Sequence, residues 1–208
     1  MATFEDQWKQ WMAEGRKRFE EMQVQFSLGK MDAADAFEKQ KDFLRGAVSN
    51  WKQELDKATD VAEEHAQKLK ASLEELQVQL NLGKAEGREK FEEQRKKIDL
   101  AMQEVYAAGK KAYHNNYDNM MHLFDSNAQA FKTGIEIIQL QFALVKMDVK
   151  EDAEKLRKEL NEKMHELSEK YNEVQKAAVK NIEEWNKHLK EGYDKMSHWV
   201  SDFLKHHK

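Results

Sequence analysis

Gln77-Val-Gln-Leu-Asn-Leu-Gly-Lys84 decides how this chain is built, because the sequence contains this octapeptide in three closely similar copies. The first copy, residues 23–30, reads Gln-Val-Gln-Phe-Ser-Leu-Gly-Lys, and the third, residues 139–146, reads Gln-Leu-Gln-Phe-Ala-Leu-Val-Lys. The next two positions match as well, with Met-Asp, Ala-Glu and Met-Asp. A match that extends beyond the octapeptide at three places indicates a repeated structural unit.

The composition predicts an all-α protein. The 208 residues include no proline, no cysteine and only 8 glycines, and 36% of them are charged. Such a composition is typical of long helices. The sequence lacks the alternating runs of β-branched residues between tight turns that would indicate strands.

Charge and cysteine content exclude several classes of function. The formal net charge is -4 and the two signs are mixed along the chain, so we expect no nucleic-acid binding. The absence of cysteine excludes disulfides, zinc sites with thiolate ligands and a cysteine nucleophile.

We expect neither a targeting signal nor a membrane span. The first residues contain no basic region followed by an apolar run. The most apolar window, residues 135–145, is interrupted by polar side chains and is far shorter than the roughly 20 residues that cross a bilayer. These features predict a soluble, cytoplasmic protein.

Apolar residues recur every three or four positions around each copy, which predicts amphipathic helices. In the first repeat this stripe contains Phe4, Trp8, Trp11, Phe19, Met22, Phe26, Gly29, Ala33, Phe37 and Leu44. The second and third repeats keep the same register, so equivalent residues fall on the same helix face.

The Gly-Lys step in the motif has two interpretations. In the first, Gly29 and Gly83 end a helix and a new helix begins at Asp32, Glu86 or Asp148, so that each copy forms a tight hairpin. In the second, the helix runs straight through each copy, and the glycines let neighbouring helices approach closely.

Two observations favour the continuous helix. The apolar stripe keeps its phase across the step, whereas a turn would normally reset it. The third copy also has Val145 where the others have glycine, and a β-branched residue is a steric outlier at positive φ.

Turns are then expected halfway between copies, near Lys57 and near Asn115. Both places contain Asp or Asn residues, which compete with helical hydrogen bonding. The second turn is expected to extend over residues 125–127, and a first linker at residues 46–50 is the alternative.

The predicted architecture is an antiparallel bundle of three, possibly four, long helices with coiled-coil-like packing. Residues 1–208 form one elongated domain in this interpretation. Its repeat units span about 1–57, 58–115 and 120–208, and the three motifs lie at one level as a shared waist.

The waist is the predicted interaction surface, because its helices are apolar on two sides. Val24 and Leu28 lie opposite the main stripe, and a helix apolar almost all round requires burial on both sides. The predicted contact residues are Gln23, Gln25, Leu28, Gly29, Lys30, Gln77, Gln79, Leu82, Gly83, Lys84, Gln139, Gln141, Leu144, Val145 and Lys146. The paired glutamines either hydrogen-bond between helices or flank the core.

The sequence offers little support for catalysis or for a bound metal. A di-iron bundle needs two Glu-x-x-His pairs and two further glutamates, and this chain has one such pair, Glu162 and His165. No phosphate-binding loop or nucleophile motif occurs. We therefore predict no enzyme activity, catalytic residue, metal site or cofactor.

The C-terminal segment contains an aromatic stripe with two interpretations. Trp185, Trp199 and Phe203 stand beside several lysines, as in helices that lie at a membrane or granule interface. Alternatively, these aromatic side chains pack with others inside the bundle.

These features predict a non-enzymatic, oligomerising helical scaffold or coat component. The expected partner is a second copy or another helical protein. In composition and helix type the chain also resembles the phasins, amphipathic helical proteins that coat storage granules, and this resemblance implies a hydrophobic granule or membrane surface as partner. A metal or cofactor carrier is a third and less favoured hypothesis.

Overall fold

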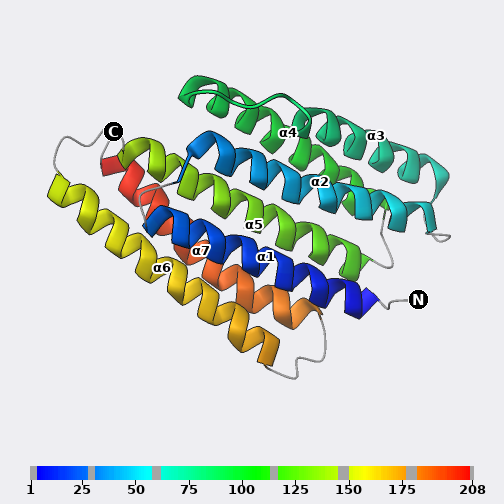
Figure 1. Cartoon of the computed structure of the whole chain (residues 1–208). Coiled ribbons are helices and arrows are strands. Elements are labelled where there is room, and N and C mark those ends of the chain that lie inside the picture. Colours follow the sequence, from blue (N-terminus) through cyan, green and yellow to red (C-terminus); the bar gives the residue numbers. More distant parts are fainter. Residues whose placement is uncertain are drawn as a thin grey trace. The chain divides into compact units, whose positions relative to one another are not determined.

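A computed structural model describes residues 4–27, 31–57, 62–112, 117–144, 150–176 and 182–206. These residues form seven α-helices and no strand, which confirms the all-α prediction (Figure 1). The helices are α1 (Phe4–Ser27), α2 (Ala33–Lys57), α3 (Glu63–Leu80), α4 (Arg88–Ala112), α5 (Tyr117–Leu144), α6 (Lys150–Lys176) and α7 (Ile182–His206). None of them combines the length and the apolarity that a membrane crossing requires.

A helix ends at every copy of the repeated motif. The helices that contain the first residues of the three copies end at Ser27, Leu80 and Leu144. The next helices begin at Ala33, Arg88 and Lys150. The starting positions are equivalent in the repeat to within one residue. Residues 31–32 and 81–87 are not helical, so the continuous-helix interpretation is wrong at the first two copies. The described residues form seven shorter helices instead of the predicted three or four long ones.

Asp32 shows why a new helix begins after the first copy. Its Oδ1 accepts hydrogen bonds from the backbone N–H groups of Ala34 and Asp35, each at 2.9 Å. A carboxylate that receives the first free N–H groups is a favourable N-cap. The predicted helix start at Asp32 is thus confirmed. At the second copy α4 begins at Arg88, one residue later than a start directly after Glu86, and Asp148 lies outside the described residues.

The expectation that a turn requires positive φ at the position of Gly83 is wrong. Among the described residues only Gly87 has positive φ, at 90°, and Gly83 lies in the preceding loop without it. A β-branched residue at the position of Gly83 therefore does not oppose a turn. The apolar stripe keeps its phase across the turn because α3 and α4 each bury their apolar face. Leu80 at the end of α3 and Phe91 in the first turn of α4 are both buried.

The first predicted turn agrees with the end of α2, whereas the alternative linker at residues 46–50 and the extension of the second turn to residues 125–127 are wrong. α2 ends at Lys57, and α4 and α5 flank residues 113–116, which lie outside the described part. Residues 46–50 lie within α2, where Ala47 and Val48 are buried, so that packing outweighs the low helix propensity of glycine. Residues 125–127 lie within α5, and the predicted last helix is α5, α6 and α7 instead.

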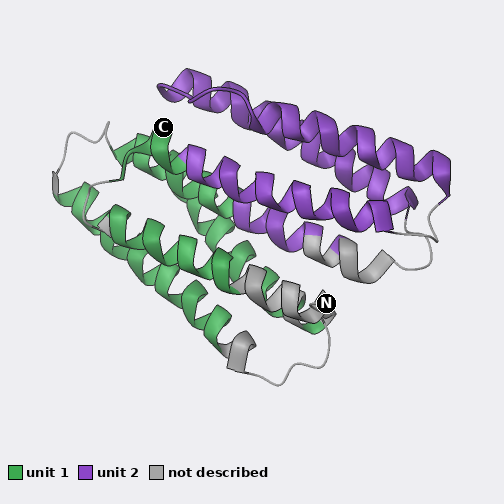
Figure 2. Ribbon diagram, turned by 45° about the vertical axis from the view of Figure 1, so that its right-hand side comes forward, with its two compact units in different colours: residues 1–36, 132–208 green, residues 37–131 purple. Residues whose placement is uncertain are grey.

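The chain divides into two compact units (Figure 2). Unit 1 consists of residues 1–36 and 132–208, and unit 2 consists of residues 37–131. Each unit buries its own apolar residues, among them Phe26, Ile138, Leu160 and Met164 in unit 1 and Leu44, Leu73, Leu76 and Ile98 in unit 2. The assignment of residues 1–208 to a single domain stays a prediction.

Equivalent positions of the repeat meet inside unit 2. Phe37 of α2 and Phe91 of α4 occupy the same position of the first and second repeats, and their rings pack edge to face with centroids 4.9 Å apart. Helices α2 and α4 therefore meet at an equivalent position of the repeat.

The left-handed residue gives a direct test of the hairpin. Gly87→Ala is expected to lower the free energy of unfolding by about 1–2 kcal/mol, because an L-residue is strained at this φ. Gly83→Ala is the matched control, since no atom lies within 4 Å of an added Cβ and φ is not positive. Urea denaturation followed by circular dichroism measures both, and equal effects would contradict the turn geometry.

Candidate functional site

The second copy of the motif forms the end of α3 and the loop that follows. Gln77 and Gln79 lie in the last turn of α3, and Leu82, Gly83 and Lys84 lie in the loop. Gly83 and Lys84 are exposed, and Leu82 is half-buried. This copy therefore presents a hairpin end rather than a helix waist.

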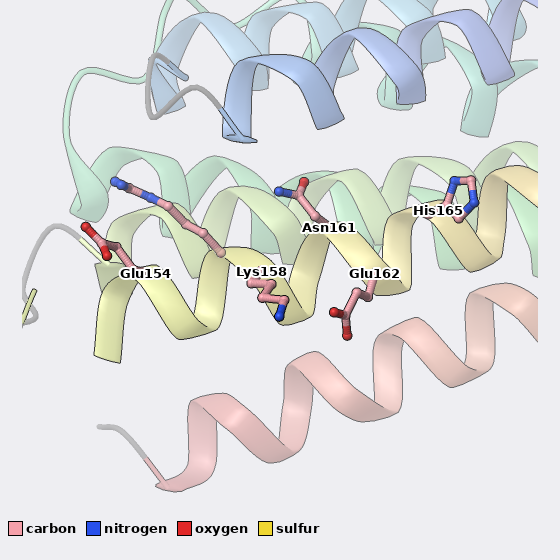
Figure 3. Close-up of a pocket in the computed structure, with 6 residues that line it drawn as sticks. Glu154, Lys158, Asn161, Glu162 and His165 are labelled. Carbon is pink, nitrogen blue, oxygen red and sulfur yellow. The ribbon is translucent and has the colours of Figure 1, made fainter. Parts of the chain in front are cut away.

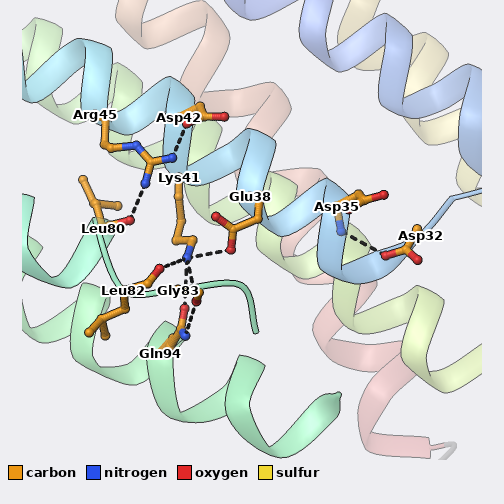
Figure 4. A network of polar contacts seen from close by, with 10 residues as sticks. All are labelled: Asp32, Asp35, Glu38, Lys41, Asp42, Arg45, Leu80, Leu82, Gly83 and Gln94. Carbon is orange, nitrogen blue, oxygen red and sulfur yellow. Dashed lines mark hydrogen bonds and ion pairs between the residues drawn. The ribbon is translucent and has the colours of Figure 1, made fainter. Parts of the chain in front are cut away.

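Two basic side chains of α2 hold this hairpin end (Figure 4). The Nζ of Lys41 donates to the Leu82 carbonyl at 2.7 Å and to Oε1 of Gln94 at 3.1 Å. Arg45 donates to the Leu80 carbonyl at 2.5 Å. Because the last carbonyls of a helix lack partners within it and form its negative end, cations are favoured there. We call this pair the Lys41–Arg45 clamp.

Lys41 is unusual because its side chain is fully buried. Its charge is balanced by an ion pair with Oε1 of Glu38 at 2.7 Å, and its ammonium group lies 5.2 Å from the ring centre of Phe37. Sequence analysis missed this residue. A signal was present, since a basic residue follows a glutamate by three positions at the same place in every repeat: Glu38 and Lys41, Glu92 and Arg95, Glu154 and Arg157.

In unit 1 the first and third copies are joined by a glutamine. The side chain of Gln141 is buried, and its Nε2 donates to the Met31 carbonyl at 3.2 Å. Gln23 donates to the Asn161 carbonyl of α6 at 3.3 Å. Glutamines of the motif thus hydrogen-bond across helices, as one of the two interpretations predicts.

Of the remaining predicted contact residues, some are partly or fully buried and the others are not described. Gln25, Gln139 and Gln79 are half-buried, and Leu144 is buried. The residues Leu28, Gly29, Lys30, Val145 and Lys146 lie outside the described part of the chain.

The second position of the motif differs in exposure among the copies. Val24 is 58% exposed and Val78 is 56% exposed, whereas Leu140 at the equivalent position is fully buried. Met31 and Ala85, which stand seven residues after these two valines, are buried. The outward apolar surface is therefore smaller than the sequence predicted.

An open groove of about 540 Å³ follows α6 (Figure 3). It is lined by Glu154, Arg157, Lys158, Asn161, Glu162 and His165. Glu162 and His165 both line this groove, as the one Glu-x-x-His pair of the chain. No group of three or more potential metal ligands occurs among the described residues.

The aromatic stripe of α7 is mostly packed inside unit 1. Tyr193, Met196 and Val200 are buried, and the hydroxyl of Tyr193 contacts that of Tyr171 on α6. Burial raises the pKa of the Tyr171 phenol above its usual range. Trp199 and Phe203 are half-buried and their rings are stacked 6.3 Å apart, while the side chain of Trp185 is not described.

No protein-family model matches this sequence, and no curated protein or solved structure is significantly similar to it.

The clamp generates a prediction for stability. Lys41→Met is expected to lower the free energy of unfolding by about 2–3 kcal/mol, because buried hydrogen bonds from a charged donor are lost. Lys68→Met is the matched control, since Lys68 is exposed and makes only an i, i+4 pair with Glu64. Chemical denaturation measures both, and a loss in Lys68→Met as large as that in Lys41→Met would contradict the role assigned to the clamp.

Proposed function

We propose that the protein is a non-enzymatic, oligomerising helical scaffold that uses the repeated motif as a contact surface. The observation that carries this proposal is the contrast at the second position of the motif. Leu140 is fully buried within the chain, whereas Val24 and Val78 at the equivalent position are more than half exposed.

A single exposed valine on a protein surface needs no explanation, but recurrence at an equivalent position does. The third copy shows that this position can be covered by packing. At the first two copies the chain leaves it exposed, and burial by a partner would contribute about 1.5 kcal/mol for each valine. Gln23 and Gln77 beside the valines can continue the kind of hydrogen bonding that the glutamines already make.

Coating of a hydrophobic granule or membrane surface is the alternative proposal. The half-buried, stacked rings of Trp199 and Phe203 near the end of α7 favour it, because aromatic side chains of this kind are suited to an interface between water and lipid. The burial of Tyr193, Met196 and Val200 opposes it, since a surface-binding helix would have to release them.

The self-association proposal predicts a specific loss. Val24→Glu and Val78→Glu together should leave helicity unchanged, since both sites are exposed, and should weaken assembly by about tenfold or more. Sedimentation velocity over a range of concentrations measures the assembly, with Gln53→Glu at an exposed site of α2 as control. A monomer at every concentration would contradict the proposal.

The coating alternative is tested with the wild-type protein and liposomes. Insertion of Trp199 into the interface should shift tryptophan fluorescence to the blue, and Trp199→Ser should remove most of that shift. An unchanged spectrum in the presence of liposomes would contradict the coating alternative and leave self-association as the remaining proposal.

A further inference from the structure

The outer face of α4 carries a charged stripe that is arranged symmetrically about Leu100. The stripe follows steps of three and four residues along the helix. It consists of Glu89, Glu93, Lys96, Leu100, Glu104, Ala107 and Lys111, all of them exposed. At 61%, Leu100 is the most exposed large apolar side chain among the described residues.

Charges at mirrored positions of this stripe have opposite signs. Lys96 and Glu104 lie four residues on either side of Leu100, and Glu89 and Lys111 lie eleven residues on either side. These four side chains form no ion pair with another described residue. Glu93 pairs with Lys97 at 2.6 Å, and its mirrored position is the uncharged Ala107.

This order of charges fits a second α4 helix only when the two run antiparallel. Each Lys96 then meets Glu104 of the second copy, and each Glu89 meets Lys111, while the two Leu100 side chains cover each other. A parallel arrangement in register would place every charge against the same charge, which is destabilising.

We infer that this face of α4 binds a second copy of the chain through an antiparallel contact with a two-fold axis at Leu100. Such a contact is isologous, because each copy contributes the same residues. It rests on the proposed function, since it names the partner and the geometry of self-association. From Glu89 to Lys111 the contact spans about 33 Å of helix.

Val78 of α3 stands at the level of Leu100 along the α3–α4 hairpin. Leu69 lies against Gly109 across the α3–α4 hairpin, with Cδ1 of Leu69 3.9 Å from the position of a Cβ on Gly109. Val78 lies nine residues after Leu69, and Leu100 lies nine residues before Gly109, so the two exposed apolar residues stand at the same level.

Because exposed ion pairs are screened, the association weakens at high salt.

Charge reversal tests the pairing. Lys96→Glu alone and Glu104→Lys alone should each weaken dimerisation by about tenfold at low salt, because each creates two like-charged pairs. The double variant should recover wild-type affinity, and an equal mixture of the two single variants should form heterodimers. Single variants that dimerise as tightly as the wild-type protein, or failure of both the double variant and the mixture to recover, would overturn the inference.

Disulfide trapping tests the geometry, and the chain is suited to it because it contains no cysteine. Leu100→Cys should form a disulfide-linked dimer under mild oxidation. Lys96→Cys and Glu104→Cys should link to each other in a mixture and should not link to themselves. Gln53→Cys, at an exposed site of α2, is the control for random collisions. Efficient self-linking of Lys96→Cys would indicate a parallel contact and overturn the inference.

The failure of this inference is distinguishable from the failure of the proposed function. Assembly that Val24→Glu with Val78→Glu abolishes, but that charge reversal on α4 leaves unchanged, contradicts the α4 contact and supports the scaffold. A strictly monomeric wild-type protein contradicts both.

Discussion

The ammonium group of Lys41 makes the interaction on which the hairpin of the second repeat depends. A helix that ends leaves its last carbonyl groups without partners, and such groups are costly when they are shielded from water. Lys41 and Arg45 donate to carbonyls at Leu80 and Leu82, and Gln94 of α4 donates to the Gly83 carbonyl at 2.8 Å. Three helices are thereby joined at one point of unit 2.

The clamp also shows how the first and second repeats pack against each other in unit 2. The basic residue of the clamp and the phenylalanine beside it, Phe37 or Phe91, follow the motif at fixed distances. In unit 2 the first repeat thus supplies the cation and the second supplies the carbonyls, while the equivalent aromatic rings pack together. Because equivalent residues follow each copy at the same distance, a residue of the first repeat can pack against its equivalent in the second.

The sequence was sufficient for the helical class and for the position of the turn after Lys57. Composition excludes strands, and Asp and Asn residues mark the region after Lys57 and the region near Asn115. It was insufficient at the motif itself. There the prediction assumed that a turn requires positive φ at Gly83 or Val145, whereas the structure has this conformation at Gly87. The repeated spacing of glutamate and a basic residue marks Lys41, but the role of the clamp depends on which hairpin packs beside α2, a tertiary fact that helical periodicity does not encode.

The proposed function rests on differences among the copies and not on their similarity. Leu140 is buried where Val24 and Val78 are exposed, and Leu100 is exposed where the first repeat has Gly46 and the third has Glu162. The proposed function assigns association to the residues that vary among the copies.

The central claim is that the second copy of the motif ends a helix and turns the chain back. Spin labels at Gln67 of α3 and Lys110 of α4 test it most directly, with labelled protein diluted in unlabelled protein so that only distances within a chain are measured. The hairpin predicts a separation within about 20 Å, because packed helices lie roughly 8–10 Å apart. A separation near 65 Å, the length of an uninterrupted helix at about 1.5 Å for each residue between the labels, would contradict it.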